Sequence, residues 1–120
     1  MVTYHLHEKG IKAEEAAYQY LKQQGLLLIT KNFRNRIGEI DLIMQDYDDI
    51  VFVEVRSRSR PDYTNALESI DEGKIRKLTA TATLFLQQKG WLEKKTGRFD
   101  VVAIDIINNT MHFNWVKNAF

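Results

Sequence analysis

The chain has 120 residues, of which 44% are hydrophobic and 28% charged, as expected for one soluble globular domain spanning residues 1–120. Its 17 basic and 16 acidic side chains leave a net charge of +1, so bulk charge indicates no particular partner. The absence of cysteine excludes disulfides and thiolate metal sites, and no apolar run suits a signal peptide or a membrane span. We therefore expect a cytoplasmic protein without a membrane partner.

The first predicted element is a helix over residues 10–24, ended by Gly25. At 100° per residue, five side chains form one apolar stripe along it: Ala13, Ala16, Ala17, Tyr20 and Leu21. Glu14 lies at the edge of that stripe, whereas Glu15 points away from it. Acids at such edges are commonly just solvated, but Glu14 is the acid of this helix that could lean over the face of a sheet.

A first strand is predicted over residues 26–33, and a hairpin follows it, because two apolar segments flank the acidic loop 46–49. If residues 46–49 form a four-residue loop, the residue numbers of any two facing positions add up to the same total. Asp41 then faces Glu54. Two carboxylates in that relation repel each other unless a cation lies between them. Mg²⁺ (or Mn²⁺) is the expected ion, because such hard cations take carboxylate oxygens.

The same pairing places Glu39 opposite Arg56, where we expect a salt bridge. Alternation along the strand puts four side chains on one side: Glu54, Arg56, Arg58 and Arg60. A row of guanidinium groups beside two carboxylates suits a polyanion whose phosphate meets a metal. The alternative is an ordinary hairpin whose acids lie at a wet edge and are neutralised by the arginines. A register change of one residue would remove the arrangement.

The central strand, residues 50–55, is apolar on both sides apart from one carboxylate, which predicts a strand covered on both faces. A basic loop, 57–66, and a helix over roughly 66–88 follow. Residues 69–72 have the form of a capping box, with Ser69 as the cap, so the regular part of the helix is expected to begin there.

Basic side chains occur in short groups along the chain, and two functions fit them. They form solvated basic faces, or they contact nucleic-acid phosphates. The residues that we assign to phosphate contact are Arg34, Arg36, Arg58, Arg60, Lys74 and Lys77.

Two further strands are predicted over residues 98–106 and 111–116, with a turn at 108–109. Asp100 and Asp105 fall on opposite sides of the first of these strands, and we expect both at its edge rather than as ligands. The element order is therefore α-β-β-β-α-β-β, in an α/β domain with a mixed five-stranded sheet flanked by helices. The long helix lets the fourth strand run parallel to the third.

Motifs along nearly the whole chain resemble the YraN family. The most specific are GEIDLI at 38–43 and VFVEV at 51–55; smaller matches include Gly10, Glu14, Asn32, Arg34, Lys74, RFDV at 98–101 and NAF at 118–120. That family is assigned to the restriction-endonuclease-like superfamily, with archaeal Holliday-junction resolvases among its relatives. The resemblance therefore implies a restriction-endonuclease-like fold.

The resemblance also implies a PD-(D/E)XK metal site. Asp41 takes the D position, Glu54 the second acid position and Arg56 the lysine position, while Glu14 matches the additional helical acid of the resolvase-like branch. Ile40 replaces the nominal proline, which is a harmless variation. Arg56 matters more, because arginine stays protonated and can only stabilise charge or position a water, so the ion would have to activate that water.

We expect a magnesium-dependent DNA endonuclease that acts on branched or otherwise structured DNA. Asp41 and Glu54 would hold the ion, with the Val55 carbonyl as a third ligand and Glu14 reaching it directly or through water. A homodimer fits the resemblance, since resolvase-like enzymes cut two strands. The alternatives are a non-catalytic nucleic-acid-binding module, which Arg56 favours, and a protein–protein adaptor, which has no positive support in the sequence.

Overall fold

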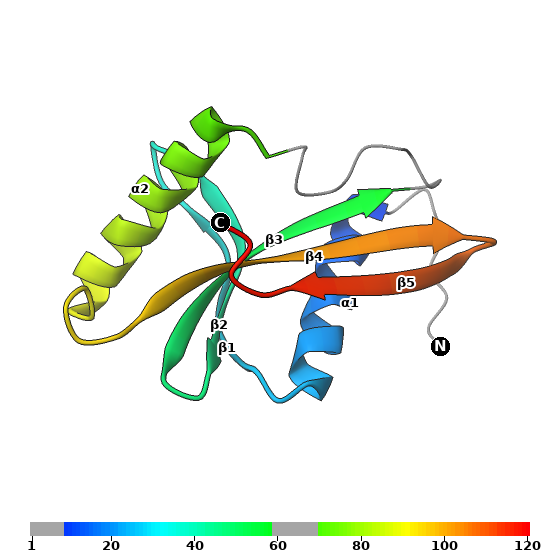
Figure 1. Ribbon diagram of the computed structural model, residues 1–120, viewed down its shortest axis with the longest axis horizontal. Helices are drawn as coiled ribbons and strands as arrows, with labels where there is room; N and C mark the ends of the chain where they lie inside the picture. Colours follow the sequence, from blue (N-terminus) through cyan, green and yellow to red (C-terminus); the bar gives the residue numbers. More distant parts are fainter. Residues whose placement is uncertain (1–8, 59–69) are drawn as a thin grey trace.

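A computed structural model describes residues 9–58 and 70–120 of the chain. Its five strands form one sheet in the order β1-β2-β3-β4-β5, with β3 and β4 parallel and the other neighbours antiparallel (Figure 1). The elements are α1 (Lys9–Gln23), β1 (Leu27–Arg34), β2 (Glu39–Asp46), β3 (Asp49–Arg58), α2 (Glu72–Lys89), β4 (Gly97–Ile107) and β5 (Thr110–Val116). The predicted element order, the mixed sheet and the parallel central pair are confirmed.

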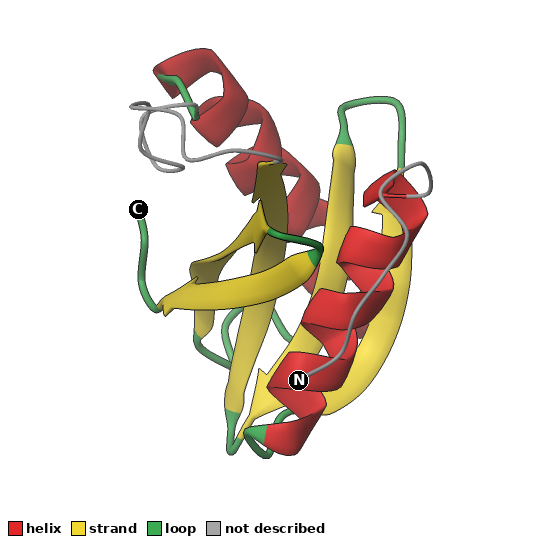
Figure 2. Ribbon diagram, turned by 90° about the vertical axis from the view of Figure 1, so that its right-hand side faces the viewer, coloured by secondary structure: helices red, strands yellow, loops and turns green. Residues whose placement is uncertain are grey.

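The two helices cover opposite faces of the sheet (Figure 2). On the α1 face, Ala17 and Leu21 are fully buried against strand residues such as Met44. On the α2 face, Phe85 packs its ring edge against Phe52 at a centroid distance of 6.1 Å. The central strands are therefore covered on both sides, as their apolar sequence predicted. Within 9–58 and 70–120, no helix has both the length and the hydrophobicity to cross a bilayer.

Both helices end as the sequence predicted, but α2 starts later. Gly25 and Gly90 follow the two helices with φ of 101° and 73°, a region that glycine enters at little cost. The residue that caps α2 is Asp71, whose carboxylate accepts the backbone N–H of Lys74 at 2.8 Å. The expectation that Ser69 caps this helix was wrong. The cap lies two residues later, at Asp71, whose side chain accepts a backbone N–H of the first helical turn.

The predicted β2–β3 register is confirmed at the pairs from Leu42 with Val53 to Asp46 with Asp49. The loop is shorter than expected, since Asp46 and Asp49 pair and leave a two-residue turn in which Tyr47 has φ of 54°. The shorter turn leaves the register unchanged. It is centred on the same two residues as the expected four-residue loop, so every other residue keeps its predicted partner.

Candidate functional site

The strands β2 and β3 separate at the end that lies away from their turn. Their ladder stops at Leu42 and Val53. One step further along, the backbone N–H of Val55 donates to Oδ2 of Asp41 at 2.9 Å. A side-chain carboxylate thus takes the place of a backbone acceptor, and the two strands open around it.

This opening forms a cleft of about 240 Å³ between α1, the sheet and the start of α2. Its lining residues are Ala13, Glu14, Asp41, Glu54, Val55, Arg56, Ser57 and Lys74. The four predicted metal ligands are all among them, together with Arg56 and Lys74. The structure therefore brings the expected acids together with two cationic side chains. Glu54 is the most buried of the charged residues here, with 7% of its surface exposed.

Two of the acids in the cleft have shifted pKa values. Burial raises the pKa of Asp41 well above its ordinary value, and hydrogen bonding with Glu54 and the charge of Glu54 raise it further, although the N–H of Val55 opposes this. Burial also raises the pKa of Glu14, and the charges of Glu39 and Glu54 add to the effect. The carboxyl groups therefore repel one another in a partly dry site, and a positive charge between them would be stabilised.

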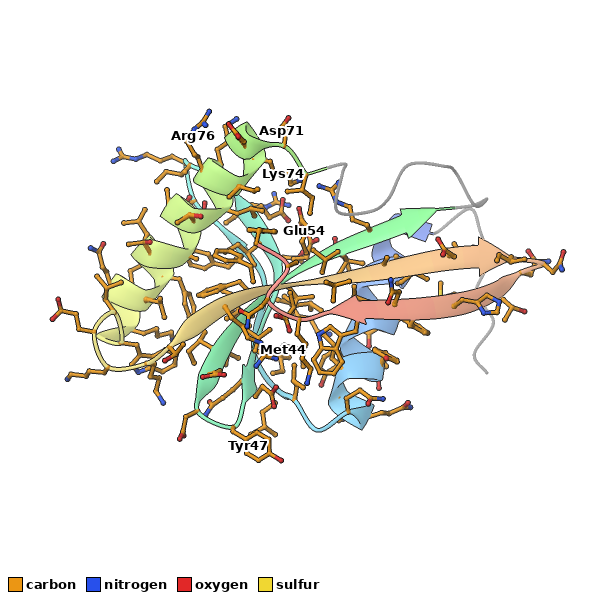
Figure 3. The ribbon with its side chains drawn as sticks, viewed as in Figure 1. Met44, Tyr47, Glu54, Asp71, Lys74 and Arg76 are labelled. Carbon is orange, nitrogen blue, oxygen red and sulfur yellow. The ribbon has the colours of Figure 1, made fainter. Side chains whose placement is uncertain are left out.

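Two cations already contact Glu54. The Nζ atom of Lys74, from α2, lies 2.9 Å from its Oε2 (Figure 3). The Nη2 atom of Arg56, from the same strand as Glu54, lies 3.4 Å from that oxygen. The expected salt bridge between Glu39 and Arg56 was wrong. Glu39 pairs with Arg34 on β1 at 3.2 Å instead, because the β2–β3 ladder ends before it reaches Glu39.

The donor set of the cleft fits a hard divalent cation with few protein ligands. In the described part of the chain, no three His, Cys, Asp or Glu side chains converge as a preformed metal cage. Two carboxylates, Asp41 and Glu54, nevertheless line the same cleft, and the charge of Glu54 raises the pKa of Asp41. Mg²⁺ commonly binds through one or two carboxylates and keeps waters or phosphate oxygens as its other ligands. Side-chain oxygens of these two residues are therefore sufficient for such an ion.

The remaining basic residues lie around the cleft rather than in it. Lys77 lines a larger groove of about 510 Å³ that shares Lys74 with the cleft. Arg34, at the end of β1, and Arg36, in the bend that precedes β2, are both exposed and do not line the cleft. The side chain of Arg58 and the whole of Arg60 lie outside the described residues. A groove that contains two lysines thus adjoins the paired acids.

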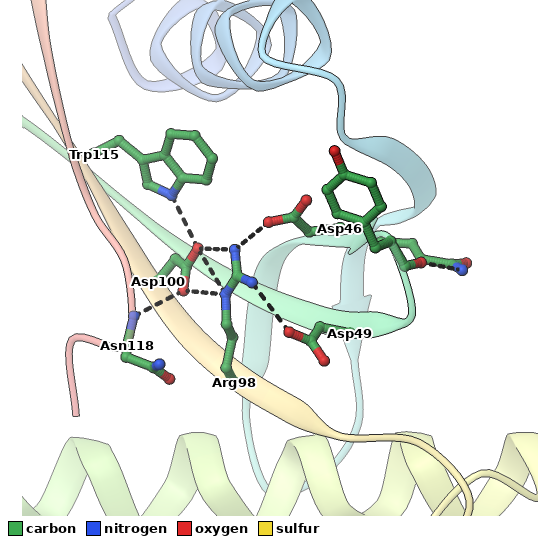
Figure 4. Close-up of polar contacts among 8 residues, drawn as sticks. Asp46, Asp49, Arg98, Asp100, Trp115 and Asn118 are labelled. Carbon is green, nitrogen blue, oxygen red and sulfur yellow. Dashed lines mark hydrogen bonds and ion pairs between the residues drawn. The ribbon is translucent and has the colours of Figure 1, made fainter.

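A second charged cluster, which was not predicted from the sequence, lies beside the β2–β3 turn (Figure 4). Arg98 on β4 contacts Asp46, Asp49 and Asp100 at 2.8, 3.3 and 3.1 Å. Burial lowers the pKa of Arg98, but the adjacent carboxylates of Asp100 and Asp46 outweigh burial and raise it. Asp100 is fully buried and also accepts a hydrogen bond from Nε1 of Trp115.

The expectation that Asp100 is an edge residue was therefore wrong. β4 lies between β3 and β5, so a side chain in its middle faces the interior. The sequence signal that could have revealed the cluster is Arg98 two positions before Asp100, because residues two apart share a face of a strand. The cluster joins the tip of the β2–β3 hairpin to β4 and β5, which is a structural role.

Comparisons with known proteins identify one family. A model described as uncharacterised protein family UPF0102 matches residues 13–104. A UPF0102 protein of Stutzerimonas stutzeri is 47% identical over 111 residues, which cover 92% of each chain. A UPF0102 protein of Pseudomonas aeruginosa is 46% identical over 115 residues (94% of this chain and 92% of the relative), and one of Nitrosococcus oceani is 41% identical over 113 (94% and 91%). The similarity includes the whole cleft.

Proposed function

We propose, from the premise that this chain belongs to the YraN/UPF0102 family, that it is a divalent-metal-dependent endonuclease acting on DNA. The observation that carries the proposal is the pair of acids in one cleft: Asp41, whose pKa is raised, and the buried Glu54. Ionising both carboxyl groups in such a partly dry site costs stability unless a cation lies between them. Such an arrangement is typical of sites that bind a cation or perform acid–base chemistry.

The proposed ligands of the ion are the carboxylates of Asp41 and Glu54, with Glu14 at the cleft wall in reach of a bound water. The Val55 carbonyl is a further ligand candidate, because the N–H of Val55 is aimed at Asp41 and a strand residue presents its N–H and C=O to the same side. When bound, a divalent ion supplies Lewis-acid stabilisation of phosphate charge and activates water. We propose Mg²⁺ or Mn²⁺, which suit oxygen ligands.

The substrate is proposed to be DNA of branched or otherwise structured form. The groove beside the cleft is lined by Lys74 and Lys77, which would bind the phosphates that flank the one being cut. Glu39 and Asp71 also line it, so the groove combines both signs of charge and is not a uniformly basic duplex track. A homodimer would present two such sites to the two strands of a junction.

The test is cleavage of a labelled four-way DNA junction with Mg²⁺ or Mn²⁺. We expect nicking by the unaltered protein, none in EDTA, and loss of at least about 100-fold in rate for both Asp41→Ala and Glu54→Ala. Asp48→Ala is the matched control, because Asp48 is an exposed carboxylate at the turn of the same hairpin. Cleavage that survives both site substitutions would come from a contaminating nuclease and would refute the proposal.

A second candidate function is DNA binding without cleavage. One observation favours it: Oε2 of Glu54 already contacts both Arg56 and Lys74, so the carboxylate is neutralised without a metal. This candidate predicts DNA binding that weakens steeply with salt, no metal-dependent nicking, and no gain of thermal stability with Mg²⁺ or Mn²⁺. The junction assay and a thermal melt with added metal therefore separate the two functions.

A further inference from the structure

Glu54 is contacted by two cations that differ in origin and surroundings. Arg56 lies two residues further along β3, and its side chain is 27% exposed. Its Nε atom is buried and has no hydrogen-bond partner in the described part of the chain. Lys74 comes from α2, on the other wall of the cleft, and its side chain is 41% exposed (Figure 3). The side chain of Lys74 is therefore the more accessible of the two to a substrate phosphate.

The backbone of Lys74 is fixed more firmly than its side chain. Its N–H donates to the capping carboxylate of Asp71 at 2.8 Å, so the residue is locked into the first turn of α2. The four-carbon stem then crosses from the helix to Oε2 of Glu54. A flexible stem on a fixed backbone allows the ammonium to move from Glu54 to a nearby phosphate oxygen without a change in the fold.

The chemistry of the two cations also differs. A guanidinium is broad, planar and suited to holding a carboxylate in a fixed orientation, whereas an ammonium is a compact point charge with three donors. Charge that develops on phosphate oxygens during cleavage needs a donor placed beforehand at that position. Arg56, which lies deeper and next to Glu54 on the same strand, fits the first task. Lys74 fits the second.

We propose that Lys74 is the catalytic cation of this site and that Arg56 is a positioning residue for Glu54. This inference rests on the proposed endonuclease function and reassigns Lys74 from phosphate binding in the groove to the reacting phosphate itself. The ammonium donates hydrogen bonds to a non-bridging oxygen of the scissile phosphate. Glu54 holds the ammonium in place until the substrate and the metal ion enter the cleft. This role accounts for the ion pair between a lysine of α2 and a carboxylate of β3.

The reaction is the hydrolysis of a phosphodiester. The oxygen of a water molecule forms a bond to phosphorus while the bond between phosphorus and one sugar oxygen breaks. One proton of the water ends on the departing sugar oxygen, and the other stays on the new terminal phosphate until solvent takes it. Lys74 remains an ammonium throughout and stabilises the negative charge that builds up on the phosphate.

The experiment compares Lys74→Met with Lys94→Met in full-length protein. Lys94 is an exposed lysine beyond the far end of α2, so each variant loses one ammonium. We measure the single-turnover cleavage rate at saturating four-way junction, the junction Kd, and Mn²⁺ affinity by calorimetry without DNA. For Lys74→Met we expect a rate at least about 100-fold lower, a Kd within about threefold, and Mn²⁺ binding as tight as in the unaltered protein or tighter, because no ammonium competes for Glu54. Lys94→Met should match the unaltered protein throughout.

Other outcomes overturn the inference in distinguishable ways. A rate within about threefold of the unaltered protein together with a raised Kd would make Lys74 a phosphate contact of the groove. A weaker Mn²⁺ affinity that accounts for the lost rate would make it a prop for Glu54. In both cases the unaltered protein still cleaves, so the proposed function survives. Absence of cleavage by the unaltered protein would instead overturn the proposed function, and the role of Lys74 with it.

Discussion

The backbone N–H of Val55 donates to Oδ2 of Asp41 at 2.9 Å, at the point where their two strands part. One hydrogen bond therefore both ends the β2–β3 ladder and aims a carboxylate at the strand that carries Glu54. The same contact limits the rise in the pKa of Asp41, since an N–H donor favours the ionised form. Burial and Glu54 nevertheless dominate, so ionising Asp41 in the metal-free cleft costs stability.

Replacing Asp41 by Asn should stabilise the metal-free protein at high pH. Burial and Glu54 raise the pKa of Asp41 from 3.8 to about 8, so between these values the folded state binds more protons than the unfolded state. Stability from this group is therefore fully present below about pH 4 and is lost as pH rises through about 8. Urea unfolding in EDTA should show Asp41→Asn more stable than the unaltered protein by about 1–3 kcal/mol at pH 8.5.

The difference should shrink at pH 5, because Asp41 is then largely protonated in the folded protein and resembles the amide. Asn keeps an oxygen that can accept the N–H of Val55, so the strand geometry is preserved. Asp48→Asn at the exposed turn controls for general loss of negative charge and should change stability by less than about 0.5 kcal/mol. Equal stability of the unaltered protein and Asp41→Asn at pH 8.5 would contradict the electrostatic account of the cleft.

Divalent cations should stabilise the protein, and they should do so more at pH 8.5 than at pH 5. A ligand that binds only the folded state at 100 times its Kd contributes about 2.7 kcal/mol. Protons compete with the cation for Asp41, so binding weakens as pH falls. Thermal melts with Mn²⁺ should show this increase in the unaltered protein and none in Asp41→Asn. A rise of equal size in both would place the ion elsewhere.

The sequence was sufficient for the fold and for the register that brings the two acids together. Apolar periodicity located the seven elements. The pairing of facing residues in the hairpin depended only on where the chain turns. The partners of the site residues could not be predicted in the same way. Lys74 lies twenty residues from Glu54 in the sequence, and their contact depends on where α2 begins, which Asp71 rather than Ser69 decides.

The same reason explains the error at Asp100. Its environment is set by Trp115 and by the hairpin tip, which reach it only after β3, β4 and β5 have assembled. A charged residue in a strand predicts an exposed edge unless its partners are known. Contacts between distant segments depend on the assembled fold, whereas turns, helix caps and apolar stripes depend on residues that are close in the sequence.

Asp100→Asn should be strongly destabilising without affecting the proposed metal site. The fully buried carboxylate accepts hydrogen bonds from Arg98, from Nε1 of Trp115 at 2.9 Å and from the backbone N–H of Asn118 at 3.1 Å. In the variant, one acceptor oxygen becomes an NH₂ group that faces donors. Arg98 also loses the carboxylate that accepts most of its hydrogen bonds. Breaking a buried pair in this way costs about 3–5 kcal/mol, which urea unfolding would measure as a lower midpoint.

The exposed Asp48→Asn again serves as the control, with an expected change below about 0.5 kcal/mol. Below its unfolding midpoint, Asp100→Asn should bind Mn²⁺ as tightly as the unaltered protein. Asp100 lies beside Val53, whose side chain points to the opposite face of the sheet from the neighbouring Glu54. A loss of less than about 1 kcal/mol would mean that Asp46 and Asp49 satisfy Arg98 without Asp100. A matching loss of metal affinity would mean that the cluster and the cleft are coupled through β3.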